Sequence, residues 1–368
     1  MDGMKILYVI EALDLGGAEQ VVIRLAQGLD RNRFQPLVAC LTEKGRFAPV
    51  LEQSGVPVFC LDKRPKLDWA LIPRLQQLIR RESIDLLHAH LFTGNLWGRL
   101  GAWRTRVPAV VTEHSVDTWK PSLYRWSDRL LKPLTTHWIF VSQQVREFYE
   151  KQLGPLGSRA SVIYNGVPLP AQPVNPSQRR PLTLATVGRL APEKEQVRFV
   201  ELIGHLRREG LPIQGLIIGD GPQQAAIEQA VKAHHIEEAI QLTGFVSRME
   251  EYWPQVDIFC LTSSREGLPL TALEAMSYGI PVLSTAVGGV RECIEDGREG
   301  VLVPFGDWPA LQAQAKRLVQ DEPWRRQLGE AGRVRVQRQF SLQQMVTRHE
   351  ALYQRLSESK GERGGAGG

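Results

Sequence analysis

The chain has 368 residues, of which 43% are hydrophobic and 23% are charged, and its formal net charge is +5. This composition excludes a disordered or fibrous protein, and the length favours two domains over one. The first 170 residues carry 22 lysines and arginines against 16 acidic residues, so the positive excess lies in the N-terminal half. Such an excess suits an anionic binding partner or an anionic membrane surface, although scattered solvated charge explains it equally well. No dense basic run or nucleic-acid-binding motif indicates DNA or RNA as a partner.

The four cysteines include no C-x-x-C pair, which indicates a reduced protein without a structural zinc. The first apolar run, MDGMKILYVI, is too short for a signal peptide, and no run of about 18 apolar residues predicts a membrane span. We therefore expect a cytoplasmic protein, with association at the inner face of the membrane left open.

Short apolar runs alternate with longer helical patterns in the first half of the chain. Strands are expected at residues 5–10, 35–41, 56–61, 86–90, 109–113 and 138–141. Helices are expected at residues 18–29, 47–54 and 69–81, with further helices between the later strands. Continuous apolar strands separated by helices predict a parallel sheet that is buried on both faces.

The pattern restarts after the turn sequence NGVP at residues 165–168. Strands are expected at residues 182–187, 213–218, 240–243, 258–261, 282–284 and 300–303, and helices at residues 196–209 and 223–234. The fold class is therefore α/β, with two Rossmann-like domains facing each other across a cleft. We place the domains at residues 1–167 and 182–340, with a proline-rich linker at 168–181, a final helix at 341–358 that packs back on the first domain, and a disordered tail at 359–368.

A glycine pair, Gly16 and Gly17, follows the first predicted strand and opens the first predicted helix. Glycines let the backbone approach a ligand closely, and a helix N-terminus favours an anion. A tight turn between strand and helix explains the pair at least as well. Because the G-x-G-x-x-G fingerprint of dinucleotide binding is missing, the sequence disfavours a nicotinamide oxidoreductase.

A second loop, with the sequence VGRLAPEK at residues 187–194, follows the first strand of the second half. Ligands of parallel sheets bind beyond the carboxyl ends of the strands, so Arg189 and Lys194 are placed to neutralise a diphosphate. The alternative is a solvated basic loop. The sequence GDGP at residues 219–222 predicts a turn, and a turn is the preferred interpretation of Asp220.

The segment SREGLPLTALE at residues 264–274 places one glutamate on a loop and another on the helix that follows. Pro269 suits the first turn of that helix, so Glu266 and Glu274 can face one ligand. A carboxylate accepts two hydrogen bonds from a vicinal diol such as a ribose, and Gly267 leaves the backbone beside Glu266 bare. The alternative, a glutamate that complements the helix dipole, fits Glu274 less well because its neighbours are apolar.

Histidines end two predicted strands of the first half, His88 and His90 on one and His114 on the other. A His-x-His pair is compatible with a metal site, but neither a D-x-D triplet nor a supporting ligand cluster accompanies it. We therefore expect no bound metal and interpret His114 as a hydrogen-bonding residue. Residues 122–134, SLYRWSDRLLKPL, interleave aromatic, leucine and basic residues, which suits a helix packed on its own domain or one that meets a membrane or a lipid-linked molecule.

Together the sequences GGAE, GRLAPEK, GDGP and E-x7-E, the last followed by AMSYGIPVLSTAVGGVRE, resemble glycosyltransferase family 4 over essentially the whole chain. The resemblance implies the GT-B fold and a retaining glycosyltransferase of the hexosyltransferase type. It implies a nucleotide-diphosphate-sugar donor, UDP- or GDP-linked, bound by the second domain, and a glycan or lipid-linked acceptor bound by the first. It further implies a role in cell-surface polysaccharide or glycolipid synthesis. The nucleotide-sugar is then a substrate, and we expect neither a cofactor nor a metal.

The resemblance also implies residue roles. Donor binding is implied for Gly16, Gly17, Arg189, Lys194, Gly244, Phe245, Val246, Glu266, Gly267, Leu268 and Glu274. Catalytic participation is implied for Glu266, His114, Arg189 and Lys194. In this scheme Glu274 holds the ribose, the two cations neutralise the diphosphate, and Glu266 with the Gly267 and Leu268 amides holds the sugar. One departure is Glu195, where the family more often has glycine, which leaves the geometry of this loop open.

Three other kinds of protein would share parts of this sequence pattern. A GT-B epimerase or phosphorylase would also bind phosphate, and a catalytically inactive subunit would keep the fold. The presence of all four charged residues of the two motifs, Arg189, Lys194, Glu266 and Glu274, argues against the inactive subunit.

Overall fold

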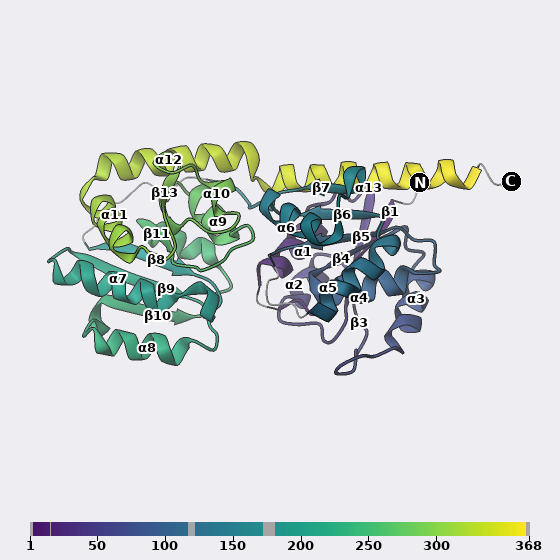
Figure 1. Ribbon diagram of the computed structural model, residues 1–368, viewed down its shortest axis with the longest axis horizontal. Coiled ribbons are helices and arrows are strands. Elements are labelled where there is room, and N and C mark those ends of the chain that lie inside the picture. Colours follow the sequence, from purple (N-terminus) through teal and green to yellow (C-terminus); the bar gives the residue numbers. More distant parts are fainter. Residues whose placement is uncertain (1–2, 15, 117–121, 172–180, 366–368) are drawn as a thin grey trace. The chain divides into compact units, whose positions relative to one another are not determined.

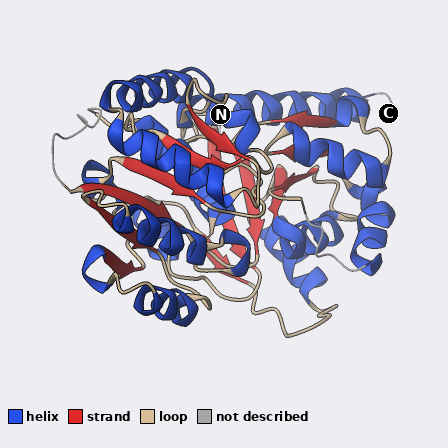
Figure 2. Cartoon of the chain, turned by 60° about the vertical axis from the view of Figure 1, so that its left-hand side comes forward, coloured by secondary structure: helices blue, strands red, loops and turns tan. Residues whose placement is uncertain are grey.

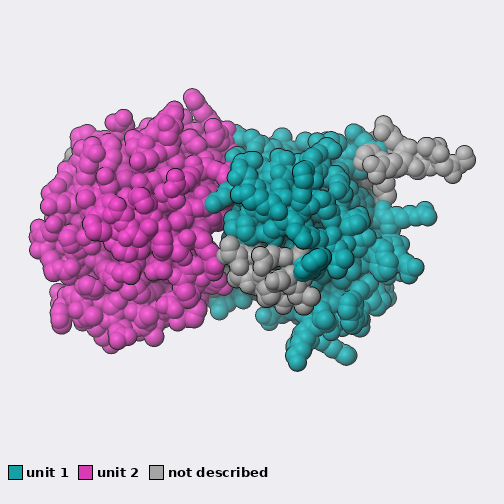
Figure 3. Space-filling view, viewed as in Figure 1, with its two compact units in different colours: residues 1–166, 342–368 teal, residues 167–341 magenta. Residues whose placement is uncertain are grey.

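The computed structural model of the chain describes residues 3–14, 16–116, 122–171 and 181–365, with side chains described except at residues 122–125 and 359–365. The chain divides into two compact units. Unit 1 consists of Met1–Gly166 and Leu342–Gly368, and unit 2 of Val167–Ser341 (Figure 3). The predicted α/β architecture with two domains is confirmed. The predicted boundary after residue 167 lies one residue later than the boundary between the units, and residues 172–180 of the expected linker lie outside the described residues.

Within the described residues, unit 1 contains a seven-stranded sheet of order β3-β2-β1-β4-β5-β6-β7 with every pair parallel. The strands are β1 Met4–Ile10, β2 Phe34–Cys40, β3 Val58–Cys60, β4 Leu86–His90, β5 Ala109–Glu113, β6 His137–Phe140 and β7 Ala160–Val162. Helices cover both faces of the sheet (Figures 1 and 2). All five residues of β4 and of β5 are buried, including the polar side chains of His88, His90, Thr112 and Glu113.

The helices of unit 1 alternate with its strands. They are α1 Gly17–Gly28, α2 Ala48–Gln53, α3 Leu71–Arg81, α4 Leu91–Ala102, α5 Ser122–Leu131, α6 Gln143–Leu153 and α13 Leu342–Gly365, with short 3₁₀ helices at Lys132–Leu134 and Gly157–Arg159. Helix α3 was expected to begin at residue 69 but begins at Leu71, because residues 62–70 form a loop with its own hydrogen bonds.

The C-terminal helix α13 belongs to unit 1 although it follows unit 2 in the sequence. It packs on α1, where the Glu350 carboxylate accepts a hydrogen bond of 2.8 Å from the backbone N–H of Asp30. The disordered tail expected from residue 359 is wrong as far as Gly365, where the helix ends.

Unit 2 contains, within the described residues, a six-stranded parallel sheet of order β10-β9-β8-β11-β12-β13. The strands are β8 Leu182–Val187, β9 Ile213–Ile218, β10 Ile240–Gly244, β11 Ile258–Leu261, β12 Val282–Thr285 and β13 Gly300–Val303. The helices are α7 Gln196–Arg208, α8 Gln224–Ala233, α9 Leu270–Ser277, α10 Val290–Cys293, α11 Trp308–Gln320 and α12 Glu322–Gln339. Short 3₁₀ helices lie at Pro192–Lys194, Glu237–Ala239, Met249–Glu251 and Trp253–Gln255. Central strands β8 and β11 pair with each other, so the loops that follow them lie side by side.

Candidate functional site

The loops that follow the strands of unit 2 meet at the carboxyl edge of its sheet, and backbone hydrogen bonds join them. The N–H of Leu190, in the loop after β8, donates to the Asp220 carbonyl after β9 at 2.7 Å. The N–H of Gly219 donates to the Gly244 carbonyl at the end of β10 at 2.9 Å. The N–H of Ser264, after β11, donates to the Glu193 carbonyl at 2.9 Å. The predicted loops of unit 2 therefore form one connected surface.

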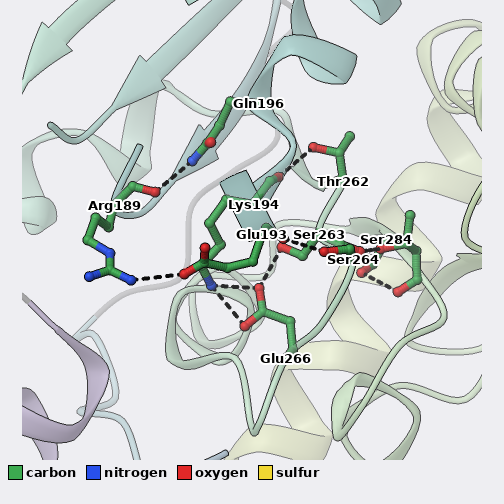
Figure 4. A network of polar contacts seen from close by, with 10 residues as sticks. Arg189, Glu193, Lys194, Gln196, Thr262, Ser263, Ser264, Glu266 and Ser284 are labelled. Atoms are coloured by element: carbon green, nitrogen blue, oxygen red, sulfur yellow. Dashed lines mark hydrogen bonds and ion pairs between the residues drawn. The ribbon is translucent and has the colours of Figure 1, made fainter. Parts of the chain in front are cut away.

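Lys194 and Glu266 are paired in this surface although 72 residues separate them in the chain (Figure 4). The Lys194 ammonium donates to Oε1 of Glu266 at 2.7 Å and to Oε2 at 2.9 Å. The Ser263 hydroxyl donates to Oε1 at 2.6 Å, so the carboxylate accepts at least three hydrogen bonds. The Glu266 side chain is 7% exposed and that of Lys194 is 27% exposed. The pair is thus a fixed, partly buried cation and carboxylate at the edge of the sheet.

Two buried threonines hold the backbone on either side of this pair. The Thr262 hydroxyl lies 3.1 Å from the Lys194 carbonyl and 2.9 Å from that of Glu195. The Thr285 hydroxyl donates to the Ser263 carbonyl at 2.6 Å, which joins the ends of β11 and β12. Sequence reasoning missed Thr262, Ser263 and Thr285, whose only signal was their position at the ends of predicted strands.

Glu195 has a left-handed backbone, with φ of +51° and ψ of +37°, immediately before α7. Glycine adopts this conformation without strain, which gives a physical reason for the glycine expected at this position. The loop keeps the left-handed turn with a glutamate in place, and Thr262 binds the Glu195 carbonyl there. The geometry that the sequence left open is therefore retained.

Gly288 and Gly289 close on the backbone of Glu266 from the loop after β12. A Cβ added to Gly288 would lie 1.8 Å from the Glu266 carbonyl oxygen, and the φ of Gly288 is +56°. The N–H of Gly289 donates to the same carbonyl at 3.4 Å. Only glycine fits at residue 288, so the sequence GGVRE, quoted for the resemblance without a role, positions Glu266.

The other predicted donor-binding residues of unit 2 lie around this centre. Arg189 is 60% exposed, and its guanidinium pairs with the Glu193 carboxylate at 2.9 Å. Glu274 is half-buried on α9, and Pro269, expected in the first turn of that helix, is its N-cap. The remaining residues lie at or after strand ends: Gly244 is the last residue of β10, Phe245 and Val246 follow it, and Gly267 and Leu268 lie in the loop after β11. Gly16 and Gly17 lie in unit 1, where Gly16 is the N-cap of α1 with extended backbone.

The predicted histidines gather in unit 1. Nδ1 of His90 lies 3.0 Å from Nε2 of His114. Nδ1 of His88 lies 2.7 Å from the Tyr353 hydroxyl of α13, and its Nε2 lies 2.7 Å from the Thr112 hydroxyl. Both ring nitrogens of His88 therefore have partners within the protein, so this residue could bind a metal only by giving one of them up.

Burial disfavours the charged form of two of these histidines, His88 and His90. It lowers the pKa of both well below the ordinary value of 6.5, and neighbouring histidines lower both pKa values further. Among the described residues Nε2 of His90 is buried without a hydrogen-bond partner. An N–H there would be a buried donor without an acceptor, so the proton of His90 belongs on Nδ1. His114 then accepts this hydrogen bond at Nε2.

Comparisons with known proteins agree with this arrangement. The family model described as "Glycosyl transferases group 1" matches residues 171–335, and that described as "Glycosyltransferase Family 4" matches residues 15–170. The N-acetyl-alpha-D-glucosaminyl L-malate synthase of Bacillus anthracis is 37% identical over 138 residues, which are 38% of this chain and 36% of that enzyme. This match thus spans about a third of the length of that relative.

A second relative is the UDP-Gal:alpha-D-GlcNAc-diphosphoundecaprenol alpha-1,3-galactosyltransferase of Escherichia coli. It is 25% identical over 344 residues, which are 87% of this chain and 89% of that enzyme. Among solved structures, HepE from Anabaena in complex with UDP has a TM-score of 0.82 at 21% identity, covering 95% of this chain and 99% of that one. The structural likeness concerns the fold.

Proposed function

The chain belongs to the GT-B glycosyltransferases, and from this premise we propose that it moves a sugar from a nucleotide-diphosphate-sugar to a hydroxyl of a glycan or lipid-linked acceptor. A UDP- or GDP-sugar is the proposed donor, and the galactosyltransferase of Escherichia coli supports UDP by its name. The reaction is proposed to retain the configuration of the sugar and to need no metal. The setting is polysaccharide or glycolipid synthesis at the cytoplasmic face of a membrane.

The Lys194–Glu266 pair is the observation that supports this function most directly. A departing nucleoside diphosphate needs fixed positive charge, and the Lys194 ammonium is held by contacts at 2.7 and 2.9 Å to the Glu266 carboxylate. A charge that is already oriented needs little rearrangement when the leaving group develops its own charge. Arg189, largely exposed, supplies a second cation whose contact to Glu193 is easily exchanged for a phosphate.

In the proposed step, the bond between the sugar C1 and the diphosphate oxygen breaks, and its electron pair leaves with the diphosphate. The acceptor oxygen forms its bond to C1 on the same face, and its proton passes to the departing phosphate oxygen. No protein nucleophile takes part, so Glu266 orients the sugar and Lys194. Exclusion of water from the site would protect the donor against hydrolysis.

Glu274 is proposed to accept hydrogen bonds from the ribose hydroxyls, and the loop at 244–246 to lie beside the base. His114 is proposed to act as a neutral hydrogen-bonding residue. The contact of 3.0 Å between Nδ1 of His90 and Nε2 of His114 supports this role, because it orients the His114 ring.

A screen of radiolabelled nucleotide-sugars for transfer, with hydrolysis as a side reaction, tests the proposal. We expect one donor to be consumed and its label to enter a glycan or lipid fraction. Lys194→Ala should lower kcat by about 100-fold or more, because it removes one preorganised charge. The exposed surface variant Lys316→Ala, in the same unit, is the control and should keep the full rate.

Three other results would reject the proposal. Conversion of the donor to an isomer without transfer would identify an epimerase, and phosphate-dependent release of sugar 1-phosphate would identify a phosphorylase. A chain that binds no nucleotide-sugar would be an inactive subunit.

A further inference from the structure

The loop that joins β3 to α3, residues 62–70, displays two large apolar side chains on the surface of unit 1. Leu67 is 67% exposed and Trp69 is 64% exposed. Figure 1 shows this loop projecting from the sheet beside α3. Isolated apolar residues on a surface are ordinary, but two in one short loop together with three basic residues require an explanation.

The residue between them, Asp68, is buried and fixes the loop. Its Oδ2 accepts a hydrogen bond of 2.9 Å from the backbone N–H of Arg64 and pairs with the Arg74 guanidinium of α3. The same guanidinium donates to the Leu61 carbonyl and, at 3.0 Å, to that of Asp62. Because the carboxylate of Asp68 points inward, the side chains before and after it are held outward.

The backbone of the loop also has a defined conformation. Asp62 and Lys66, neither of them glycine, have φ of +46° and +65°. Trp69 and Trp97 of α4 form a T-shaped ring pair, with centroids 6.0 Å apart and planes at 74°, while most of the Trp69 side chain stays exposed. The loop is therefore a defined element that holds Leu67 and Trp69 in place without covering them.

Basic side chains accompany the apolar pair. Arg64 and Lys66 are exposed and Lys63 is half-exposed, whereas Asp68 is neutralised by Arg74. The remaining acid of the loop, Asp62, accepts a hydrogen bond from the Cys60 thiol at 3.1 Å. An apolar tip beside several cations matches the boundary of an anionic bilayer, where tryptophan favours the interface and lysine and arginine meet lipid phosphates.

We propose that residues 62–70 dock unit 1 on an anionic lipid bilayer, with Leu67 and Trp69 entering the interface and Lys63, Arg64 and Lys66 contacting lipid phosphates. The choice of a lipid surface rests in part on the lipid-linked acceptor of the proposed function, but docking itself needs neither donor nor catalysis. The helix of residues 122–134, which the sequence suggested for this purpose, is the rival surface, since Trp126 and Leu130 are also exposed.

Sedimentation of the full chain with vesicles tests the proposal. The vesicles are phosphatidylcholine with or without phosphatidylglycerol. We expect the wild type to sediment with the anionic vesicles only. The double variant Leu67→Ser/Trp69→Ser should bind at least about tenfold more weakly, and each lysine replaced by glutamine should weaken binding by about fivefold. The matched control, Trp126→Ser/Leu130→Ser, removes side chains 58% and 73% exposed and should bind like the wild type.

Several outcomes would overturn the proposal: a wild type that ignores anionic vesicles, equal binding to neutral ones, or loss of binding in the control pair instead. Self-association of the wild type that disappears in Leu67→Ser/Trp69→Ser would show that the loop binds a second copy. Unfolding curves of all variants verify that they fold, which is expected because the replaced side chains are exposed. Calorimetric binding of UDP and GDP, measured on the same proteins without vesicles, tests the proposed function separately.

Discussion

The ion pair between Lys194 and Glu266 predicts a measurable coupling in the stability of unit 2. An exposed pair contributes up to about 1 kcal/mol, whereas removing one partner of a fully buried pair costs about 3–5 kcal/mol. With side chains 7% and 27% exposed, this pair lies between the two limits. Because the ammonium contacts both carboxylate oxygens, we expect a coupling free energy of about 1–3 kcal/mol from the cycle of Lys194→Met, Glu266→Gln and the double variant.

The two single variants should differ. Lys194→Met leaves a carboxylate that is 7% exposed with its charge uncompensated, although Ser263 still donates to it. Glu266→Gln leaves an ammonium that is 27% exposed and can turn to water. Lys194→Met should therefore cost more free energy of unfolding than Glu266→Gln.

Urea unfolding of the full chain, with hydrogen exchange followed in peptides from β8 and β11, measures the stability of unit 2 apart from that of unit 1. The exposed pair Arg298–Glu295, with side chains 67% and 60% exposed, serves as the control cycle and should give a coupling near zero. A coupling below about 0.5 kcal/mol for Lys194 and Glu266 lies within the error of additivity and would refute the pairing.

Three further predictions concern the backbone and the buried histidines. Glu195→Gly should raise the free energy of unfolding by up to about 1 kcal/mol, since it relieves the strain of a left-handed backbone at a residue with a side chain. The control Glu209→Gly, where φ is −78°, should lower the free energy of unfolding. Chemical denaturation of both variants shows whether the two changes have opposite signs. Gly288→Ala should lower the stability of unit 2 by more than about 2 kcal/mol and abolish nucleotide binding, and a wild-type denaturation curve would contradict the close approach to Glu266. Burial lowers the pKa of His349 from 6.5 to about 4, so the unfolded chain takes up this proton first as the pH falls. As the pH falls from 6.5 to about 4, His349 should lower the free energy of unfolding by about 3 kcal/mol. Chemical denaturation of His349→Gln over the same pH range should show a decrease that is smaller by this amount.

The strands were largely predictable because their burial is visible in the sequence. Residues 86–90, 109–113, 182–187 and 213–218 were expected as strands and are strands with the same bounds. Most of their residues are apolar, which favours burial in a sheet that is covered on both faces. Helices α11 and α12 were not named in advance. The sequence of α12 is rich in Arg, Gln and Glu and its apolar residues are sparse, whereas about half of the residues of α11 are apolar.

The site was predictable as a set of loops but not as a set of contacts. The rule that ligands bind at the carboxyl ends of parallel strands placed Lys194 and Glu266 on the same edge. Their pairing depends on which strands are neighbours. Neither the sequence around Lys194 nor that around Glu266 shows that β8 and β11 lie next to each other. For the same reason two residues could not be recognised from their own surroundings: Thr285, which binds the Ser263 carbonyl from β12, and Gly288, which approaches the Glu266 backbone from the next loop.

The partnership of His88 with Tyr353 has a consequence for how the protein is made. Synthesis proceeds from the N-terminus, so the strands of unit 1 leave the ribosome first and all of unit 2 follows them. The buried hydrogen bond between His88 and Tyr353 cannot form until Tyr353 has been synthesised, after residue 341 has ended unit 2. Unit 2 can thus finish folding while unit 1 still lacks one helix. A nascent chain released before residue 353 would carry a finished second unit attached to a first unit whose interior is incomplete.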